Sequence, residues 1–278
     1  MDSFPETLEQ DDLLLRPPTE ADLSDIARQL GDPRIAPWLA TVAQPVDTQQ
    51  ARALLIHGQH PGEEVRLIQR GGSVVGALCI GASLWYWLDP EHWRHGIMQR
   101  ALTMAIHARF ARPAPPLVAT CHEDNTPSRA LLGQLGFAPY PVGRRMFFHG
   151  TQRAEPCRDY LLAPEQWHLL HPPEISAGQA TLRPARQSDA ATLARMLPRA
   201  GTAPWPVAET LPVFIETHRF RGPREALFVI EDDTRRTIGM ALITHGGCAL
   251  CFLSDRDEQR HRAWVDAALA EDSRQSSP

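Results

Sequence analysis

The stretch that decides the fold is Tyr86-Trp87-Leu88-Asp89-Pro90-Glu91-His92-Trp93-Arg94-His95-Gly96-Ile97-Met98. Residues 84–88 are predicted to form a strand, and apolar side chains recur at helical spacing through residues 96–111. A strand, a short loop with a glycine and a helix therefore follow one another. The free N–H groups of the first helical turn and the helix dipole favour an anion at such a junction. Gly96 allows the backbone to approach a ligand closely.

A second stretch, Cys121-His122-Glu123-Asp124-Asn125-Thr126-Pro127-Ser128, contains the only asparagine of the chain. The chain also has no lysine, which indicates a bias against residues with A-rich codons. An asparagine retained under that bias is expected to have a specific role. The turn at Asn125 opens a predicted helix over residues 126–135, with Pro127 in the first turn, where its missing N–H costs little. Two helix N-termini then flank one groove.

Composition excludes several classes of protein. The 278 residues are enough for two domains, and 43% are hydrophobic, so a buried core is expected. A net charge of -5 argues against a nucleic-acid binder. No apolar run reaches the roughly 18 residues needed to span a membrane, and the N-terminus lacks a signal-peptide core. Five scattered cysteines fit the reducing cytoplasm, which is the expected location. Cys248 and Cys251 are interpreted as strand residues and no metal site is expected.

The chain contains an internal repeat with an offset of 167 residues. Leu15-Arg16-Pro17 with Asp22 recurs as Leu182-Arg183-Pro184 with Asp189. Further along the offset becomes slightly shorter, and Val74-Val75-Gly76 corresponds to Thr237-Ile238-Gly239, and Trp87-Leu88 to Phe252-Leu253. The sequence therefore predicts a tandem duplication of one unit. Residues 164–178, which include Pro172-Pro173, are interpreted as the linker.

The first unit is expected to be an α/β domain with helices flanking a mixed sheet, in the order β-α-α-β-β-β-α-β-α-β-β. A strand ends at Arg16-Pro17 and a helix follows it. The remaining predicted elements are a helix over residues 47–58, a hairpin of residues 64–70 and 73–80, the strand 84–88, the helix 96–111, the strand 117–121, the helix 126–135 and two strands ending near residue 162.

On these residues the chain resembles the GNAT family of acetyl-CoA-dependent N-acetyltransferases. The resemblance is strongest to the subgroup that acetylates N-terminal amines of ribosomal proteins. It covers roughly residues 10–168 and rests on five features: residues 86–89, Gly96-Ile97, residues 121–128, Gly136-Phe137 and the tail Asp159-Tyr160-Leu161-Leu162. It implies a mostly antiparallel mixed sheet that splays between the strands ending at Asp89 and Cys121.

The resemblance also implies the cofactor site. The pantetheine arm of acetyl-CoA would pair with free backbone near residues 87–89 as an added strand does. The pyrophosphate would lie on the amides of residues 94–98, and Asn125 would hold the pantetheine. The implied cofactor-binding residues are Trp87, Leu88, Asp89, Arg94, His95, Gly96, Ile97, Met98, Asn125 and Ser128.

Catalysis by direct attack of the amine needs a proton donor for the leaving thiolate. Many family members carry a tyrosine seven residues after the asparagine, but here that position is Leu132, so Ser128 is the predicted acid. The glutamate proposed as the base in the ribosomal subgroup falls at Phe147. Either Glu123, His122 or Glu91 relays the proton through water, or the site is a poor catalyst; Glu123 is the candidate adopted. Met98 is larger than the residue typical of the family.

Each of these residues also has an ordinary structural interpretation. Asn125 suits a helix cap, and Ser128 suits an exposed first turn. Arg94, His95, Glu123 and His122 suit a surface, and Cys121 suits the filling of a strand end.

Two domains are predicted, a GNAT domain over residues 1–168 and a truncated repeat over residues 169–278. In the repeat, residues 258–262 lack the loop glycine, and the chain ends after one helix, so we expect no acetyl-CoA there. Its exposed sheet edge would be covered by packing of the two units or by a homodimer. The predicted function is acetyl transfer to a primary amine, either a protein N-terminus or a small molecule. The alternative is a non-catalytic acyl-CoA-binding or interaction protein.

Overall fold

The structure is a computed structural model that describes residues 4–57, 62–201, 204–220, 226–244 and 247–274. The chain forms two compact units. One comprises Met1–Phe110 and Ala114–Ala163, and the other Ala111–Pro113 and Pro164–Pro278. Each has its own sheet and its own buried core.

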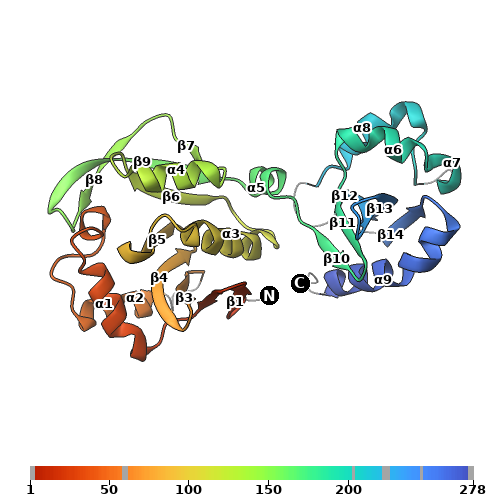
Figure 1. Ribbon diagram of the computed structural model, residues 1–278. Helices are drawn as coiled ribbons and strands as arrows, with labels where there is room; N and C mark the ends of the chain where they lie inside the picture. Colours follow the sequence, from red (N-terminus) through yellow and green to blue (C-terminus); the bar gives the residue numbers. More distant parts are fainter. Residues whose placement is uncertain (1–3, 58–61, 202–203, 221–225, 245–246, 275–278) are drawn as a thin grey trace. The chain divides into compact units, whose positions relative to one another are not determined.

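The sheet of the first unit is mixed and mostly antiparallel, as the sequence predicts, with the order β1-β2-β3-β4-β5-β6-β9-β7 and β8 paired to β9 (Figure 1). Among the described strands of this sheet, only β5 and β6 pair in parallel. The hairpin and the strand after it have the predicted bounds. The strands are β1 (Leu8–Gln10), β2 (Leu13–Arg16), β3 (Glu64–Arg70), β4 (Ser73–Ile80), β5 (Leu84–Leu88), β6 (Leu117–His122), β7 (Ala138–Pro139), β8 (Arg144–Phe148) and β9 (Arg153–Leu162).

Helices cover the sheet of the first unit and connect its strands. Leu23, Ile26 and Ala51 bring α1 and α2 against Trp87 of β5, which places these helices on one face. Residue 58, the predicted end of α2, lies outside the described residues. The helices are η1 (Glu20–Asp22), α1 (Leu23–Leu30), η2 (Ala36–Trp38), α2 (Thr48–His57), η3 (Pro90–His92), α3 (Ile97–Phe110) and α4 (Thr126–Gln134).

The second unit has a five-stranded antiparallel sheet in the order β10-β11-β12-β13-β14. Two apolar cores lie on its faces. Cys248 and Cys251 lie on β14, at the end of this sheet. The elements are α5 (Pro164–Leu170), β10 (Ile175–Ala177), β11 (Ala180–Pro184), η4 (Gln187–Asp189), α6 (Ala190–Ala194), α7 (Leu197–Ala200), η5 (Ala208–Thr210), α8 (Leu211–Thr217), β12 (Ala226–Asp232), β13 (Thr237–Thr244), β14 (Gly247–Phe252) and α9 (Asp255–Arg274).

The prediction of a linker over residues 164–178 is wrong. These residues form α5 and β10. Trp167 is fully buried and stacks on His171 at 3.8 Å between ring centroids. Burial of that ring outweighs the effect of Pro172-Pro173, which only separates the helix from the strand.

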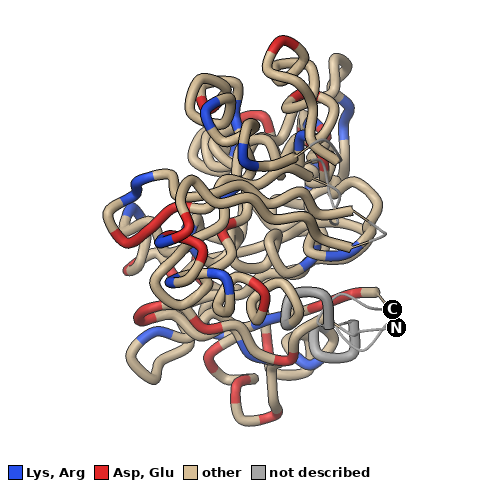
Figure 2. The backbone as a smooth tube through the Cα atoms, turned by 90° about the vertical axis from the view of Figure 1, so that its right-hand side faces the viewer, with Lys and Arg blue, Asp and Glu red and all other residues tan. Residues whose placement is uncertain are grey.

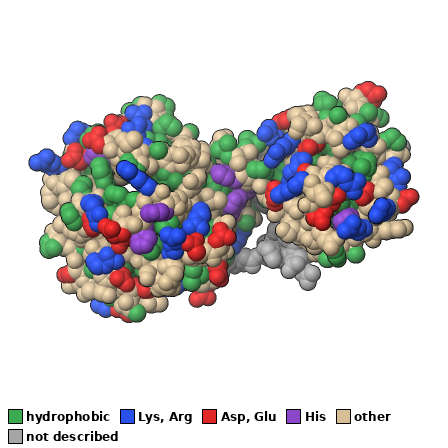
Figure 3. Space-filling model, in the orientation of Figure 1, with side chains coloured by type: hydrophobic (Ala, Val, Ile, Leu, Met, Phe, Trp, Pro, Cys, Tyr) green, Lys and Arg blue, Asp and Glu red, His purple; other side chains and the backbone are tan. Residues whose placement is uncertain are grey.

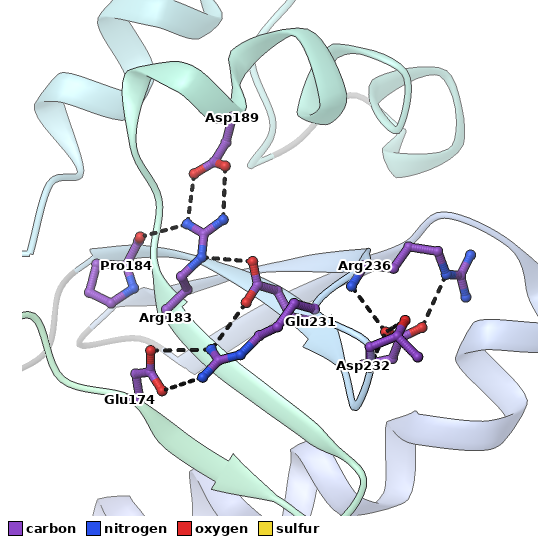
Figure 4. A network of polar contacts seen from close by, with 9 residues as sticks. Glu174, Arg183, Pro184, Asp189, Glu231, Asp232 and Arg236 are labelled. Carbon is purple, nitrogen blue, oxygen red and sulfur yellow. Dashed lines mark hydrogen bonds and ion pairs between the residues drawn. The ribbon is translucent and has the colours of Figure 1, made fainter.

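An arginine cluster occurs in both units. Arg183 donates to both oxygens of Asp189 and to Glu231 (Figure 4). Glu231 also accepts from Arg235, which reaches Glu174. In the first unit, Arg16 makes the corresponding bonds to Asp22 and Gln69.

The two sheets also share a backbone irregularity. The pairing of β3 with β4 shifts between Ile68 and Gln69, opposite Gly76. The pairing of β12 with β13 shifts between Ile230 and Glu231, opposite Gly239. Because Gly76 pairs with Leu88 and Gly239 with Phe252, the sheets align Leu88 with Phe252. The alignment of Trp87 with Phe252 expected from the sequence is therefore wrong by one residue, since side-chain similarity does not define strand register.

Charges of both signs are interspersed along the backbone (Figure 2) and over the visible face of each unit (Figure 3). Many form ion pairs, such as Arg34 with Glu91 and Arg236 with Asp257. Among the described residues, no helix has the length and apolarity that a membrane span requires.

Candidate active site

Strands β5 and β6 separate soon after they meet. They share one register pair, Leu84 with Ala119, although β5 continues to Leu88 and β6 to His122. On its other side β5 pairs with β4 along its whole length. Within the described sheet, the edge of β5 beyond Leu84 therefore has no strand partner. This is the splay that the family resemblance predicts between these two strands.

Backbone N–H and C=O groups of successive residues in β5 point alternately towards β4 and towards the splay. Asp89 N–H donates to Val75 of β4 at 2.8 Å, so Asp89 and Trp87 direct their backbone groups towards β4. Tyr86 and Leu88 then direct theirs towards the splay. The carbonyl of Leu88 accepts from Trp93 Nε1 at 2.8 Å. The N–H and C=O of Tyr86 and the N–H of Leu88 remain to pair with an extended ligand.

Two of the predicted contact residues, Trp87 on β5 and Asp89 directly after it, have other partners. Trp87 is buried, and its Nε1 donates to Gln29 at 3.0 Å. The carboxylate of Asp89 is also buried; it accepts from Arg28 at 3.0 Å and from the N–H of Glu91 at 3.1 Å. Both side chains thus hold the end of β5 in place.

The loop after β5 has two residues in the left-handed region, Arg94 at φ 65° and Gly96 at φ 70°. A Cβ at Gly96 would meet nothing within 4 Å, so backbone conformation explains the glycine. Left-handed residues within a tight loop can direct neighbouring backbone N–H groups to one side and make a concave site for anions. Arg94, His95 and Gly96 are exposed, whereas Ile97 and Met98 are buried.

Asn125 is the N-cap of α4. Its Oδ1 accepts from the N–H of Ser128 at 3.2 Å, so the capping interpretation holds. Its backbone N–H donates to His122 at 3.0 Å, and Arg129 N–H donates to its carbonyl. These bonds leave the side-chain amide N–H groups available, because capping uses only the oxygen.

Ser128 lies against a residue for which the sequence alone predicted no role. Its hydroxyl is 2.7 Å from that of Tyr86. Burial raises the pKa of Tyr86, and the hydrogen bond to Ser128 opposes the rise. Cys121 is buried beside them, and burial raises the pKa of its thiol as well. Because side chains alternate along β5, Tyr86 points opposite to Trp85 and Trp87, towards α4. That period-two pattern is the signal that could have identified it.

The candidate bases have other partners. Glu123 accepts from Arg158 at 3.3 Å, and Glu91 forms an ion pair with Arg34 at 3.0 Å. His122 is buried, and its Nδ1 accepts from the N–H of Asp124 at 3.0 Å. Phe147 lies on β8 and is 46% exposed.

Comparison with known proteins identifies the fold. The model of the acetyltransferase (GNAT) domain matches residues 12–138. A search of curated proteins found no match. The microcin C7 self-immunity acetyltransferase MccE, solved with acetyl-CoA and AMP, is 16% identical, with a TM-score of 0.50 over 55% of this chain and 93% of its own.

Two further solved structures are similar. A putative acetyltransferase from T. thermophilus is 22% identical, with a TM-score of 0.51 over 61% of this chain and 95% of its own. The ribosomal-protein-S5-alanine acetyltransferase of Vibrio fischeri is 19% identical, with a TM-score of 0.49 over 58% and 98%. The match of the family model assigns residues 12–138 of this chain to a GNAT acetyltransferase domain.

Proposed function

We propose that the first unit transfers the acetyl group of acetyl-CoA to a primary amine, either a protein N-terminus or a small molecule. The observation that carries the proposal is the splay, which has the Gly96 loop at one end and the Tyr86–Ser128 pair near the other. An extended pantetheine arm along Leu88 and Tyr86 would lead from the loop towards these hydroxyls.

Acetyl transfer requires one proton to leave the amine nitrogen and one proton to reach the thiolate. The neutral amine attacks the thioester carbon, the N–C bond forms and the C–S bond breaks. The nitrogen loses one proton and the thiolate gains one, which gives the amide and free CoA. Ser128 donates to the thiolate and is resupplied by Tyr86 through their 2.7 Å hydrogen bond. Glu123 remains the proposed base, acting through water, because its carboxylate is 37% exposed.

The proposed contacts with acetyl-CoA include all the predicted cofactor-binding residues except the side chains of Trp87 and Asp89. Leu88, Gly96, Asn125 and Ser128 contact acetyl-CoA, as do the amides of residues 94–98. Trp87 and Asp89 support the strand, since their side chains are engaged elsewhere.

The second unit is proposed to be a partial copy of the first that does not bind acetyl-CoA. The shared register shift and the shared arginine cluster support the duplication. The first residues of α9, beginning at Asp255, bring carboxylates to the helix N-terminus where phosphate would need bare amides.

The competing function is acyl-CoA binding without catalysis. Phe147 at the expected base position and the engaged side chains of His122 and Glu91 favour it. Calorimetry with acetyl-CoA tests binding, and release of free CoA thiol tests transfer. The panel contains peptides with a free N-terminus, their N-acetylated forms and small amines. Binding without CoA release from any amine supports the competing function, and absence of binding at millimolar acetyl-CoA contradicts both.

A further inference from the structure

A polar cluster lies on the sheet of the first unit beside the splay. It consists of Thr120 on β6, Asp159 on β9 and Arg144 on β8, and is called here the acceptor-side cluster. Thr120 Oγ1 donates to Asp159 Oδ1 at 2.6 Å. Arg144 binds both carboxylate oxygens at 3.0 Å and donates to Thr120 Oγ1 at 3.2 Å. The carboxylate is thereby held in one orientation.

The cluster lies on the face of the sheet opposite Ser128. Thr120 directly follows Ala119, which pairs with Leu84 of β5. Side chains of paired residues share a face and alternate along each strand. Ala119 therefore shares a face with Tyr86, whereas Thr120 shares one with Trp87. Asp159 pairs with Thr120 in register and points the same way.

Asp159 keeps one place for a ligand. A carboxylate has about four acceptor positions. Oδ1 uses two, for Thr120 and Arg144, and Oδ2 uses one, for Arg144. The side chain is 28% exposed, so the remaining position on Oδ2 is accessible. The hydrogen bonds from Arg144 lower the pKa of Asp159, so the carboxylate is charged at neutral pH.

A second carboxylate on this face, that of Asp89 directly after β5, is not accessible to a ligand. Asp89 is buried and is held by Arg28 and by the N–H of Glu91. His122, on the same face as Thr120, is enclosed by the rings of Trp38 and Phe148 at centroid distances of 5.4 and 5.2 Å.

We propose that Asp159 Oδ2 binds the acceptor nitrogen and selects primary amines that can donate an N–H bond to it. This inference rests on the proposed acetyl transfer. The amine is then held on the face opposite Ser128, so it attacks the thioester from one side while the leaving thiolate is protonated from the other. Arg144 and Thr120 are positioning residues that orient the carboxylate.

The test compares Asp159→Asn with Glu155→Gln, which also replaces a carboxylate by an amide on β9. Glu155 is four residues away and is half-buried. For the D159N protein, KM for the amine should rise about 10- to 100-fold, as expected for loss of a hydrogen bond to a charged group. Its Kd for acetyl-CoA should match that of the E155Q protein. Asp159→Glu, which keeps the charge, should give an intermediate KM.

Each outcome is decisive. If the wild-type protein acetylates no amine, the proposed function fails before this inference is reached. If the wild-type protein is active and D159N has the amine KM of E155Q, the inference is overturned. It is also overturned if D159N weakens acetyl-CoA binding as much as it raises the amine KM, because Asp159 would then only support the fold. Should D159N not fold, as judged by its thermal transition, an unchanged amine KM for D159E would overturn the proposal.

Discussion

The hydroxyl groups of Tyr86 and Ser128 lie 2.7 Å apart, although the residues come from β5 and from the first turn of α4. They meet beyond the point where β5 and β6 stop pairing. The position of Leu132 in α4 carries no tyrosine, and we propose that Tyr86 of β5 takes the place of that residue. The pair is the proposed source of the proton for the leaving thiolate.

Removal of either hydroxyl should slow turnover. We expect Ser128→Ala and Tyr86→Phe each to lower kcat about 10²- to 10⁴-fold, the usual contribution of a general acid, with a small change in the Kd for acetyl-CoA. The double variant should lose no more than the more severe single variant, because the two groups act in series. Steady-state kinetics check this, and fully additive losses would contradict a shared proton route.

Asn125 has a cap role and a proposed ligand role that can be separated. Asn125→Ala should cost about 1 kcal/mol of stability through loss of the cap and should also weaken acetyl-CoA binding. Asn125→Asp keeps the cap oxygen and should retain stability. Because it lacks the amide N–H groups, it should bind acetyl-CoA more weakly than the wild-type protein, as Asn125→Ala does. Chemical denaturation and calorimetry measure the two effects. Normal acetyl-CoA affinity in N125D would refute the ligand role.

Gly96 should be sensitive to substitution because of its conformation. At φ 70°, an alanine is strained by about 1 kcal/mol, which should displace the loop amides and weaken acetyl-CoA binding. Gly133→Ala is the matched control. Gly133 lies inside α4, and a Cβ there would meet nothing within 4 Å, so alanine should stabilise the fold by about 0.5–1 kcal/mol. Isothermal titration of both variants with acetyl-CoA checks the contrast. Equal affinities of the two variants would contradict the proposed binding of acetyl-CoA by the loop amides.

Acid should destabilise the first unit through Asp22. Hydrogen bonds from Arg16 lower its pKa from 3.8 to about 2. A carboxyl with a depressed pKa in the folded state stabilises the fold above its unfolded pKa and loses this effect as the pH falls through the folded value. The shift corresponds to about 2 kcal/mol, lost between roughly pH 4 and pH 2.

The control for this prediction is Asp22→Asn. It should be less stable at neutral pH and should show a shallower loss of unfolding free energy over the same pH range. Urea denaturation at several pH values measures both proteins. Parallel pH profiles would mean that Asp22 contributes little to acid sensitivity.

Local patterns in the sequence predicted much of the fold. The double glycine after residue 70 and the flanking apolar strands defined the hairpin, and the Asn125–Ser128 turn defined the start of α4, because turn and cap chemistry acts over a few residues. The resemblance to the GNAT family predicted the splay between β5 and β6. The repeat of Leu15-Arg16-Pro17 marked a cluster that the structure contains in both units.

Contacts between distant residues required the tertiary structure. Tyr86 meets Ser128 across 42 residues, and Asp159 meets Thr120 across 39. The register that aligns Leu88 with Phe252 depends on a shift in strand pairing, which side-chain similarity does not reveal. By itself, then, the sequence determined most of the element order of the first unit and the family resemblance, because these follow from local patterning and motif spacing. The short strands β1 and β7 were not predicted. The tertiary structure decided which hydroxyl, carboxylate and backbone groups meet at the splay, because strand register and pairing bring together residues that are far apart in the chain.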